Sequence, residues 1–148
     1  MKLAKNLSNF DDIIKMYESD LLDCRDNITI RGKSLETALK EQPAWSAYYG
    51  ERAAELSILV KYLDMQVNRV RAQHTVRYKE NYNPALSERL MDKYIDKEQD
   101  YLDMFEMYLE VKELHEKYLQ VLEAFNRRGF ALRDLTTAKV HQLQDDVL

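Results

Sequence analysis

The sequence predicts an all-α protein. Only three glycines and two prolines occur among 148 residues, so few residues are available to build tight turns. Apolar residues recur at intervals of three and four over long stretches, which is the spacing of one face of an α-helix. These two observations argue against an all-β fold. They also disfavour a doubly wound α/β fold, whose crossover connections need more glycine and proline.

Short helices and a connector are predicted over residues 10–42. Asn9 is a helix-capping residue, and the acidic pair that follows Phe10 favours the first turn of a helix. The β-branched residues within 26–32 precede a glycine and predict an extended connector. A second short helix is expected to end before Pro43, because the residue before a proline avoids the helical conformation.

Two long helices and a terminal one are predicted after the first proline. The first, over 44–79, has apolar residues at helical spacing and spans about 50 Å at 1.5 Å per residue. The loop before Pro84 separates it from a second long helix over 85–127. Basic residues and Gly129 predict the end of that helix, and an amphipathic C-terminal helix follows over 130–145.

The expected architecture is one helical domain over 1–148, an elongated antiparallel hairpin of long helices. Such long helices cannot bury both of their sides in a monomer of this size. We therefore expect a homo-oligomer whose copies cover one another, with the C-terminal helix as an oligomerisation helix. A kinked, compact monomeric bundle is the alternative.

Charge is unevenly distributed along the chain. The whole chain has 22 basic and 26 acidic residues, for a net charge of −4. Residues 61–80 nevertheless carry five basic and two acidic residues, whereas residues 81–124 carry five and eleven. A local cluster of cations suits contact with phosphates, and a solvated helix face is the alternative. This basic island consists of Lys61, Arg69, Arg71, Arg77 and Lys79.

Two tyrosines adjoin the basic island. Tyr78 and Tyr82 have rings that can stack on unpaired bases while neighbouring cations bind the backbone phosphates. Packing inside the turn is an equally good interpretation of both residues. The sequence therefore predicts a nucleic-acid-binding surface made of the basic island and this pair of tyrosines.

No motif of an enzyme is found. The acidic residues over 92–113 form a stripe at helical spacing, but no Glu-x-x-His motif accompanies them, so a solvated or partner-facing surface is expected in place of a metal site. The single Cys24 cannot form an internal disulfide, which fits a reducing cytoplasm. No stretch of 18 apolar residues occurs, so neither a membrane span nor a signal peptide is expected. We expect no cofactor.

Three groups of residues resemble the UvsY-type recombination mediator proteins of tailed phages. Residues 122–132, Leu-Glu-Ala-Phe-Asn-Arg-Arg-Gly-Phe-Ala-Leu, resemble the family's apolar helix closed by an Arg-Gly-Phe turn. Residues 28–36, with the Pro-x-Trp and Tyr-Tyr pairs of 43–49, are similar to its N-terminal block. A basic helix running into a tyrosine-containing loop is similar to its DNA-binding region.

The resemblance implies a non-enzymatic protein that binds single-stranded DNA. It further implies contacts with a phage recombinase and a phage single-strand binding protein in the host cell cytoplasm. Family members assemble as closed rings, which here implies a hexamer or heptamer. The terminal helix is important for that assembly, which implicates Phe130, Leu132 and Leu135 in the subunit contact.

The sequence thus leaves two main functional hypotheses, and a metal-dependent enzyme on a helical bundle is a third, which the absence of a Glu-x-x-His motif disfavours. The first is a mediator of homologous recombination, repair and replication that helps load a recombinase onto strands covered by single-strand binding protein. The second is a structural or adaptor coiled-coil protein that binds only protein partners, through the acidic stripe and the tyrosines of the helix seam.

Overall fold

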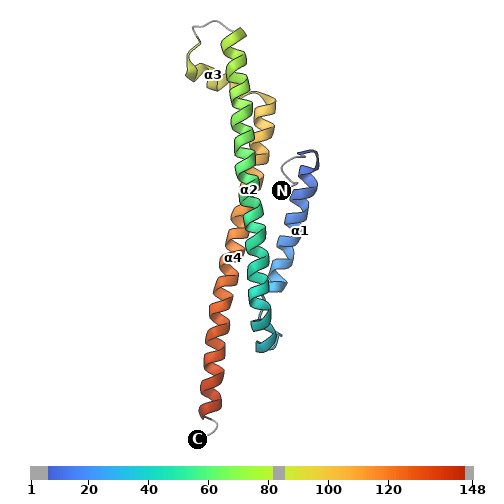
Figure 1. The fold of residues 1–148 in the computed structure, drawn as a ribbon, viewed down its shortest axis with the longest axis vertical. Coiled ribbons are helices and arrows are strands. Elements are labelled where there is room, and N and C mark those ends of the chain that lie inside the picture. The colour runs from blue at the N-terminus through green and yellow to red at the C-terminus, as the bar shows by residue number, and fades with distance from the viewer. Residues whose placement is uncertain (1–6, 82–85, 146–148) are drawn as a thin grey trace. The chain divides into compact units, whose positions relative to one another are not determined.

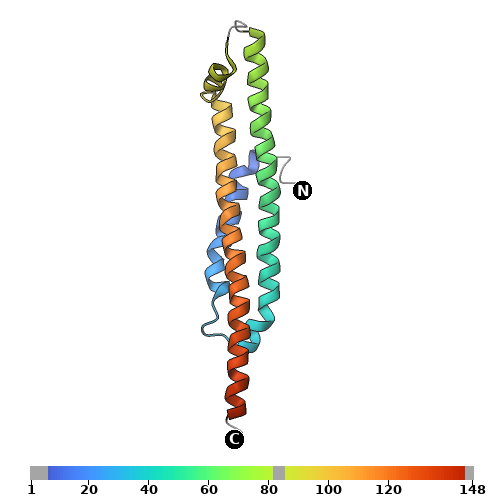
Figure 2. The same cartoon turned by 90° about the vertical axis from the view of Figure 1, so that its left-hand side faces the viewer.

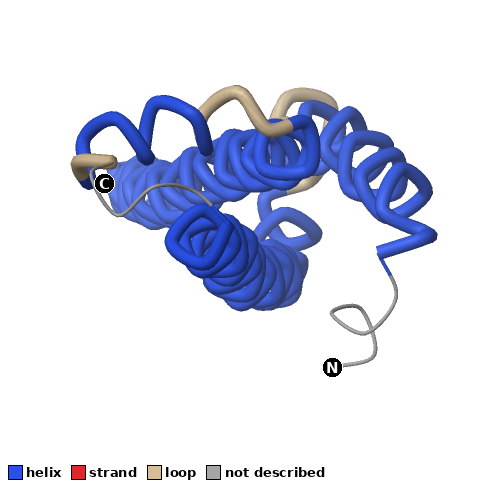
Figure 3. Tube along the Cα trace, turned by 90° about the horizontal axis from the view of Figure 1, so that it is seen from above, coloured by secondary structure: helices blue, strands red, loops and turns tan. Residues whose placement is uncertain are grey.

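A computed structural model describes residues 7–81 and 86–145, and these residues form helices joined by short loops (Figures 1 and 3). A 3-10 turn, Leu7–Asn9, leads into α1, Phe10–Ile28. The other helices are α2, Leu35–Asn81, α3, Glu88–Ile95, and α4, Gln99–Asp145. No strand occurs among the described residues, and the expected all-α class is confirmed. None of the helices in this part of the chain is sufficiently long and apolar to cross a membrane.

The chain forms two compact units, and α2 and α4 each contribute to both. Unit 1 contains Leu56–His115 together with residues 7–8. Unit 2 contains Asn9–Glu55 and residues 116–145. Within each unit, the matching parts of α2 and α4 lie side by side (Figures 1 and 2). The expectation of one domain over 1–148 stays a prediction.

The connector between α1 and α2 is shorter than expected and lies further along the chain. Helix α1 continues to Ile28, and the hydroxyl of Thr29 donates to the Arg25 carbonyl, 2.7 Å away, at its end. Gly32 adopts a φ of 82°, which glycine accepts without steric cost. The Ser34 hydroxyl then accepts a hydrogen bond from the Thr37 amide, 3.1 Å away, so a serine caps α2.

The expected helix break before Pro43 is wrong, because α2 runs through this proline without interruption. A proline inside a helix costs about 3 kcal/mol, since it removes a backbone hydrogen bond. Tertiary contacts next to Pro43 offset this cost. The Gln42 amide nitrogen donates to the Phe125 carbonyl, 2.6 Å away, and Ala38 is fully buried with its carbonyl 3.3 Å from Arg128 Nη1.

The helix expected over 85–127 is interrupted by a turn. Helix α3 begins after Ser87, whose hydroxyl accepts from the Leu90 amide, and it ends eight residues later. The amides of Lys97 and Glu98 then donate to carbonyls three residues back, which forms a turn before α4. Carboxylates around this turn bind cations of α2, and these contacts stabilise the interruption.

The expected helix end at Gly129 is also wrong, and no separate helix covers 130–145. Helix α4 passes through Gly129 and continues to Asp145. A Cβ at position 129 would lie 3.1 Å from the Gln42 amide nitrogen, closer than nearly all such contacts. The glycine therefore permits close packing of the Gln42 side chain on α4 and does not act as a helix terminator.

The core of unit 1 joins three helices. Val67 and Tyr78 of α2 pack with Met91 and Ile95 of α3 and with Tyr101 of α4. All five side chains are buried. Because apolar side chains of α3 are part of this core, the short helix is held against α2 in spite of its length.

The core of unit 2 is rich in tyrosine. Tyr49 stacks on Phe125 with ring centres 4.9 Å apart, and Tyr17 meets Tyr118 edge to face at 5.8 Å. The Tyr118 hydroxyl donates to the Tyr17 carbonyl, 2.7 Å away, so its polar end is satisfied. Burial raises the pKa of Tyr49 to about 12, and this hydroxyl is therefore neutral at physiological pH.

One arginine is buried in unit 2. The Arg128 side chain donates to the Ile28 carbonyl at 3.0 Å, to Gln42 Oε1 at 2.6 Å and to the Ala38 carbonyl at 3.3 Å. Its Nη2 lies 3.9 Å from a Glu41 carboxylate oxygen. Arg128 thus connects the end of α1, the start of α2 and α4 through one side chain.

Candidate nucleic-acid interface

The five cations of the basic island all lie on α2 within unit 1, but they do not form one surface. Arg71 and Arg77 bind carboxylates of α3 and of the turn that follows it. Lys61, Arg69 and Lys79 are exposed. The helix therefore divides the predicted binding residues into two sets with different surroundings.

Arg71 is held by three side chains. Its guanidinium contacts Asp92 Oδ1 at 3.2 Å and Asp96 Oδ1 at 2.8 Å, and it donates to the Tyr101 hydroxyl at 2.8 Å. It also lies over the Tyr101 ring, 4.7 Å from the ring centre. The hydrogen bonds to Tyr101 and Asp96 raise the pKa of Arg71. A phosphate would have to compete with two carboxylates for this cation.

Arg77 and Tyr78 share one carboxylate. Arg77 Nη2 lies 2.6 Å from Glu98 Oε1, and the Tyr78 hydroxyl donates to the same oxygen at 2.5 Å. The Tyr78 ring is only 9% exposed and belongs to the core of unit 1. The expectation that Tyr78 stacks on bases is therefore wrong for this conformation, because the ring face is already covered by protein.

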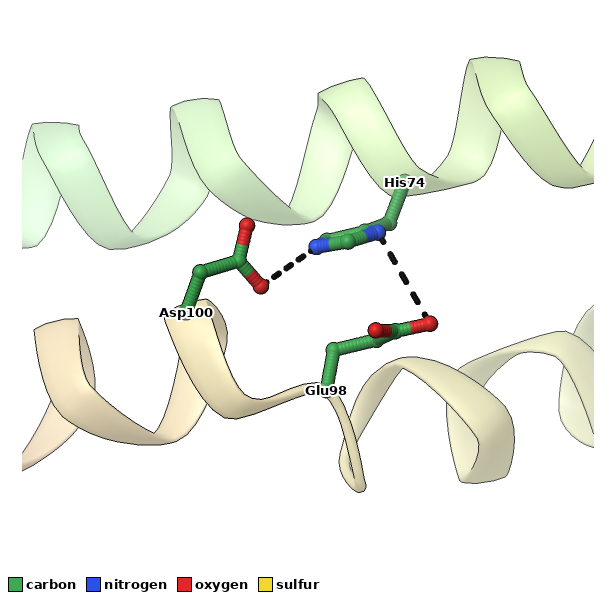
Figure 4. A group of neighbouring side chains, drawn as sticks. All are labelled: His74, Glu98 and Asp100. Carbon is green, nitrogen blue, oxygen red and sulfur yellow. Dashed lines mark hydrogen bonds and ion pairs between the residues drawn. The ribbon is translucent and has the colours of Figure 1, made fainter.

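His74 lies between two carboxylates in the same region (Figure 4). Its side chain is buried, with Nε2 2.6 Å from Asp100 Oδ1 and Nδ1 4.0 Å from Glu98 Oε1. The hydrogen bond from His74 lowers the pKa of Asp100. The pKa of Glu98 is also lowered, chiefly by the hydrogen bond from Tyr78 and then by the positive charge of Arg77.

His74, Glu98 and Asp100 are also close enough together to be considered as metal ligands. Their geometry is that of a hydrogen-bonded network, because each carboxylate faces a different ring nitrogen (Figure 4). A metal held at about 2.1 Å from both Nε2 and Asp100 would keep those atoms roughly 3 Å apart or more, beyond the 2.6 Å observed. Glu98 is moreover already bound by Arg77 and Tyr78.

The lowered pKa values of Asp100 and Glu98 predict acid sensitivity of this network. A carboxyl whose pKa is lower in the folded state stabilises that state above its unfolded pKa, about 4, and loses this effect as the pH falls through the folded pKa. Replacing Asp100 by asparagine should therefore lower the free energy of unfolding at pH 7 and pH 5. In urea titrations the difference between the parent and the variant should shrink as the pH is lowered below about 4.

Asp103→Asn is the matched control for this experiment. It removes a carboxylate one turn further along α4, which accepts only from the Gln99 side chain on the same helix. Its effect should be smaller at neutral pH. An Asp100→Asn defect that is as large at pH 3 as at pH 7 would contradict the role of the ionised carboxylate.

The exposed cations of the island share one face of α2. Lys61, Arg69 and Lys79 have no ion pair with any residue in the described part of the chain. Positions 61, 65, 69, 72, 76 and 79 follow one another by threes and fours, so they lie on one side of the helix. All six residues are exposed. We call this the cationic face: Lys61, Met65, Arg69, Ala72, Val76 and Lys79.

The remaining predicted site residues differ in their exposure to solvent. Tyr82 lies outside the described residues. Phe130 is 59% exposed and Leu135 is 47% exposed, as a surface contact requires. Leu132 is fully buried within the chain, so its expected place at a subunit contact is wrong. Leu132 lies on the same buried face of α4 as Phe125, which is seven residues earlier.

Part of the acidic stripe pairs with basic side chains inside unit 1. Asp92 and Asp96 bind Arg71, and Asp100 binds His74. These pairs and the role of His74 are not evident from the sequence. The available signal was the positive charge of residues 61–80 beside the negative charge of 81–124, which favours pairing between two neighbouring helices.

Known proteins were compared with the chain at the levels of family, sequence and structure. No protein-family model, curated protein or solved structure matches it. A function is therefore inferred from the residues of the cationic face and from the short motifs in the sequence.

Proposed function

We propose that the protein is a recombination mediator that binds single-stranded DNA through the cationic face of α2. The observation that carries this proposal is that Lys61, Arg69 and Lys79 are exposed on one side of a helix and have no carboxylate partner in the described chain. Cations of this kind bind phosphates without giving up an existing ion pair. The motifs shared with UvsY-type mediators support the same class of function.

The spacing of the three cations suits contact along a strand. At 1.5 Å per residue, Lys61 and Arg69 are about 12 Å apart along the helix axis, and Arg69 and Lys79 about 15 Å apart. Met65 and Val76 between them are exposed apolar side chains against which bases can pack. This arrangement is expected to bind the backbone with little preference for sequence.

In this proposal the chains form an antiparallel hairpin of long helices and assemble as a ring of six or seven copies. Three cations per subunit give weak binding, and a ring multiplies it because one strand contacts several copies at once. The assembled protein would contact a phage recombinase and a phage single-strand binding protein in the host cytoplasm, and would help the recombinase nucleate on the strand.

Replacing the three exposed cations tests the proposal. The variant Lys61→Ala/Arg69→Ala/Lys79→Ala should bind a fluorescent oligo-dT at least about tenfold more weakly in anisotropy titrations at low salt. The slope of log affinity against log salt should fall by about 2, since each lost phosphate contact on a single strand contributes roughly 0.7. Unchanged affinity and slope would refute the assignment.

The control variant changes net charge by the same amount elsewhere. Lys15, Lys93 and Lys139 are exposed and lie on α1, α3 and the end of α4. Replacing them by alanine should leave oligonucleotide binding within about twofold. Equal losses in the two triple variants would mean that binding follows net charge and not the cationic face.

An adaptor that binds only proteins is the second candidate. It is favoured by exposed apolar side chains on α4, among them Leu102 and Leu109, next to acidic residues. This function predicts no binding of oligo-dT even at low salt, so the same titration of the parent protein separates the two candidates.

A further inference from the structure

Unit 2 contains an apolar groove with a positively charged border. It has a volume of about 600 Å³ and lies between α1 and α4. None of the residues that line it is acidic, and two of them, Arg25 and Lys117, are cations. Its main lining residues are Leu21, Leu22, Arg25, Lys117, Val121 and Ala124. The groove thus suits an apolar ligand surface that carries negative charge.

Leu22 is the most exposed of the apolar side chains that line this groove. Its side chain is 78% exposed, the highest value among the exposed large apolar residues in the described part of the chain. An exposed leucine beside a groove costs solubility in a free monomer and becomes favourable when a second apolar surface covers it. The partner must therefore offer apolar side chains at helical or extended spacing, together with carboxylates.

The same chain carries such a surface in unit 1. Leu102, Phe105 and Leu109 of α4 are exposed, and their spacing of three and four residues puts them on one face of the helix. Glu106 and Glu113 belong to the same face. We call this the acidic face. Anchors at positions i, i+3 and i+7 are the pattern by which an amphipathic helix binds in a groove between two others.

We propose that the groove of one copy binds the acidic face of a second copy. The apolar anchors would enter the groove beside Leu22 and Val121, and the Glu106 carboxylate would lie near Arg25. The two surfaces are different, so this contact is heterologous, and a pair of copies still has one groove on one copy and one acidic face on the other available. The inference goes beyond DNA binding, because neither surface includes a residue of the cationic face.

Heterologous contact makes the proposal testable by mixing two defective variants. Leu22→Asp/Arg25→Glu disables the groove, and Leu102→Asp/Leu109→Asp disables the acidic face. The substituted side chains are all exposed, so helicity by circular dichroism should match the parent. Leu119→Asp is the control, because Leu119 of α4 is about as exposed as Leu102 and Leu109 but does not line the groove.

Sedimentation without DNA gives the readout. The parent and Leu119→Asp should associate at micromolar concentrations, and association should weaken as salt is raised. Each double variant alone should associate at least about tenfold more weakly. An equimolar mixture should form a dimer of one copy of each and nothing larger, since only one intact groove and one intact acidic face can meet.

Three results would overturn the inference. The first is a parent protein that stays monomeric at about 10⁻⁴ M, because a specific contact has a smaller dissociation constant. The others are double variants that associate like the parent, and a mixture that stays monomeric. A monomeric parent would leave the groove to a partner protein. A protein that does not self-associate would lose the multiplied binding of a ring, but the two triple-alanine variants would still differ from each other if the cationic face binds oligo-dT. Failure of this contact and failure of DNA binding are therefore distinguishable.

Discussion

Replacing Arg128 by methionine is expected to lower the free energy of unfolding by about 3 to 5 kcal/mol. The Arg128 side chain is buried and donates to the Ile28 carbonyl, the Ala38 carbonyl and the Gln42 side chain. Methionine fills much of the same space but removes the donor from the Ile28 carbonyl and from Gln42 Oε1, which are both partly buried, and each unsatisfied group costs about 1 to 3 kcal/mol. Urea titration followed by circular dichroism at pH 7 measures the difference.

Arg127→Met is the matched control for this prediction. Arg127 is the preceding residue, is exposed, and pairs only with Glu123 one turn earlier on the same helix. Exposed pairs of this kind contribute about 0.3 to 0.5 kcal/mol, so the control should remain close to the parent. If the two variants were equally stable, the network around Arg128 would not hold α1, α2 and α4 together as described.

Replacing Leu132 by alanine is expected to lower the free energy of unfolding by about 3 kcal/mol, within the range of 2 to 5 for buried leucines. Leu132 is fully buried inside the chain, so truncation removes apolar contacts and leaves a cavity. A residue at a subunit contact would behave differently, because its loss would reduce assembly and leave the stability of the single chain unchanged. Denaturant titration at low protein concentration distinguishes the two roles.

Leu135→Ala is the comparison that makes this result interpretable. Leu135 is the same residue type, three positions further along α4, and is exposed. Its truncation should change stability by less than about 0.5 kcal/mol, as is usual for surface positions. A similar loss in both leucine variants would contradict the assignment of Leu132 to the core.

The sequence predicted the helical class and the beginning of α1 because these depend on local properties, namely composition and periodicity. Asn9 precedes α1 as expected, although its side chain makes no capping hydrogen bond. Prediction from the sequence failed at Pro43 and Gly129, where local rules favour a helix end. At both positions the deciding contacts come from far along the chain. Gln42 binds the backbone of α4 and also occupies the space that Gly129 leaves open.

The candidate site shows the same division between local and distant information. Composition identified the cluster of cations, and the exposed members, Lys61, Arg69 and Lys79, are suited to the predicted role. Arg71 and Arg77 pair with carboxylates that lie 21 to 25 residues further along the chain. Such pairs depend on which helix faces which, and the spacing of residues within one helix does not reveal this.

The contacts of Arg128 constrain when the protein can fold during synthesis. Its acceptors lie 86 to 100 residues earlier in the chain, whereas unit 1 is built almost entirely from the continuous segment Leu56–His115. A ribosome therefore releases all of that segment before Arg128 emerges. Unit 1 is able to fold before Arg128 is available, and unit 2 must wait with the buried face of α1 uncovered until α4 has emerged as far as Arg128.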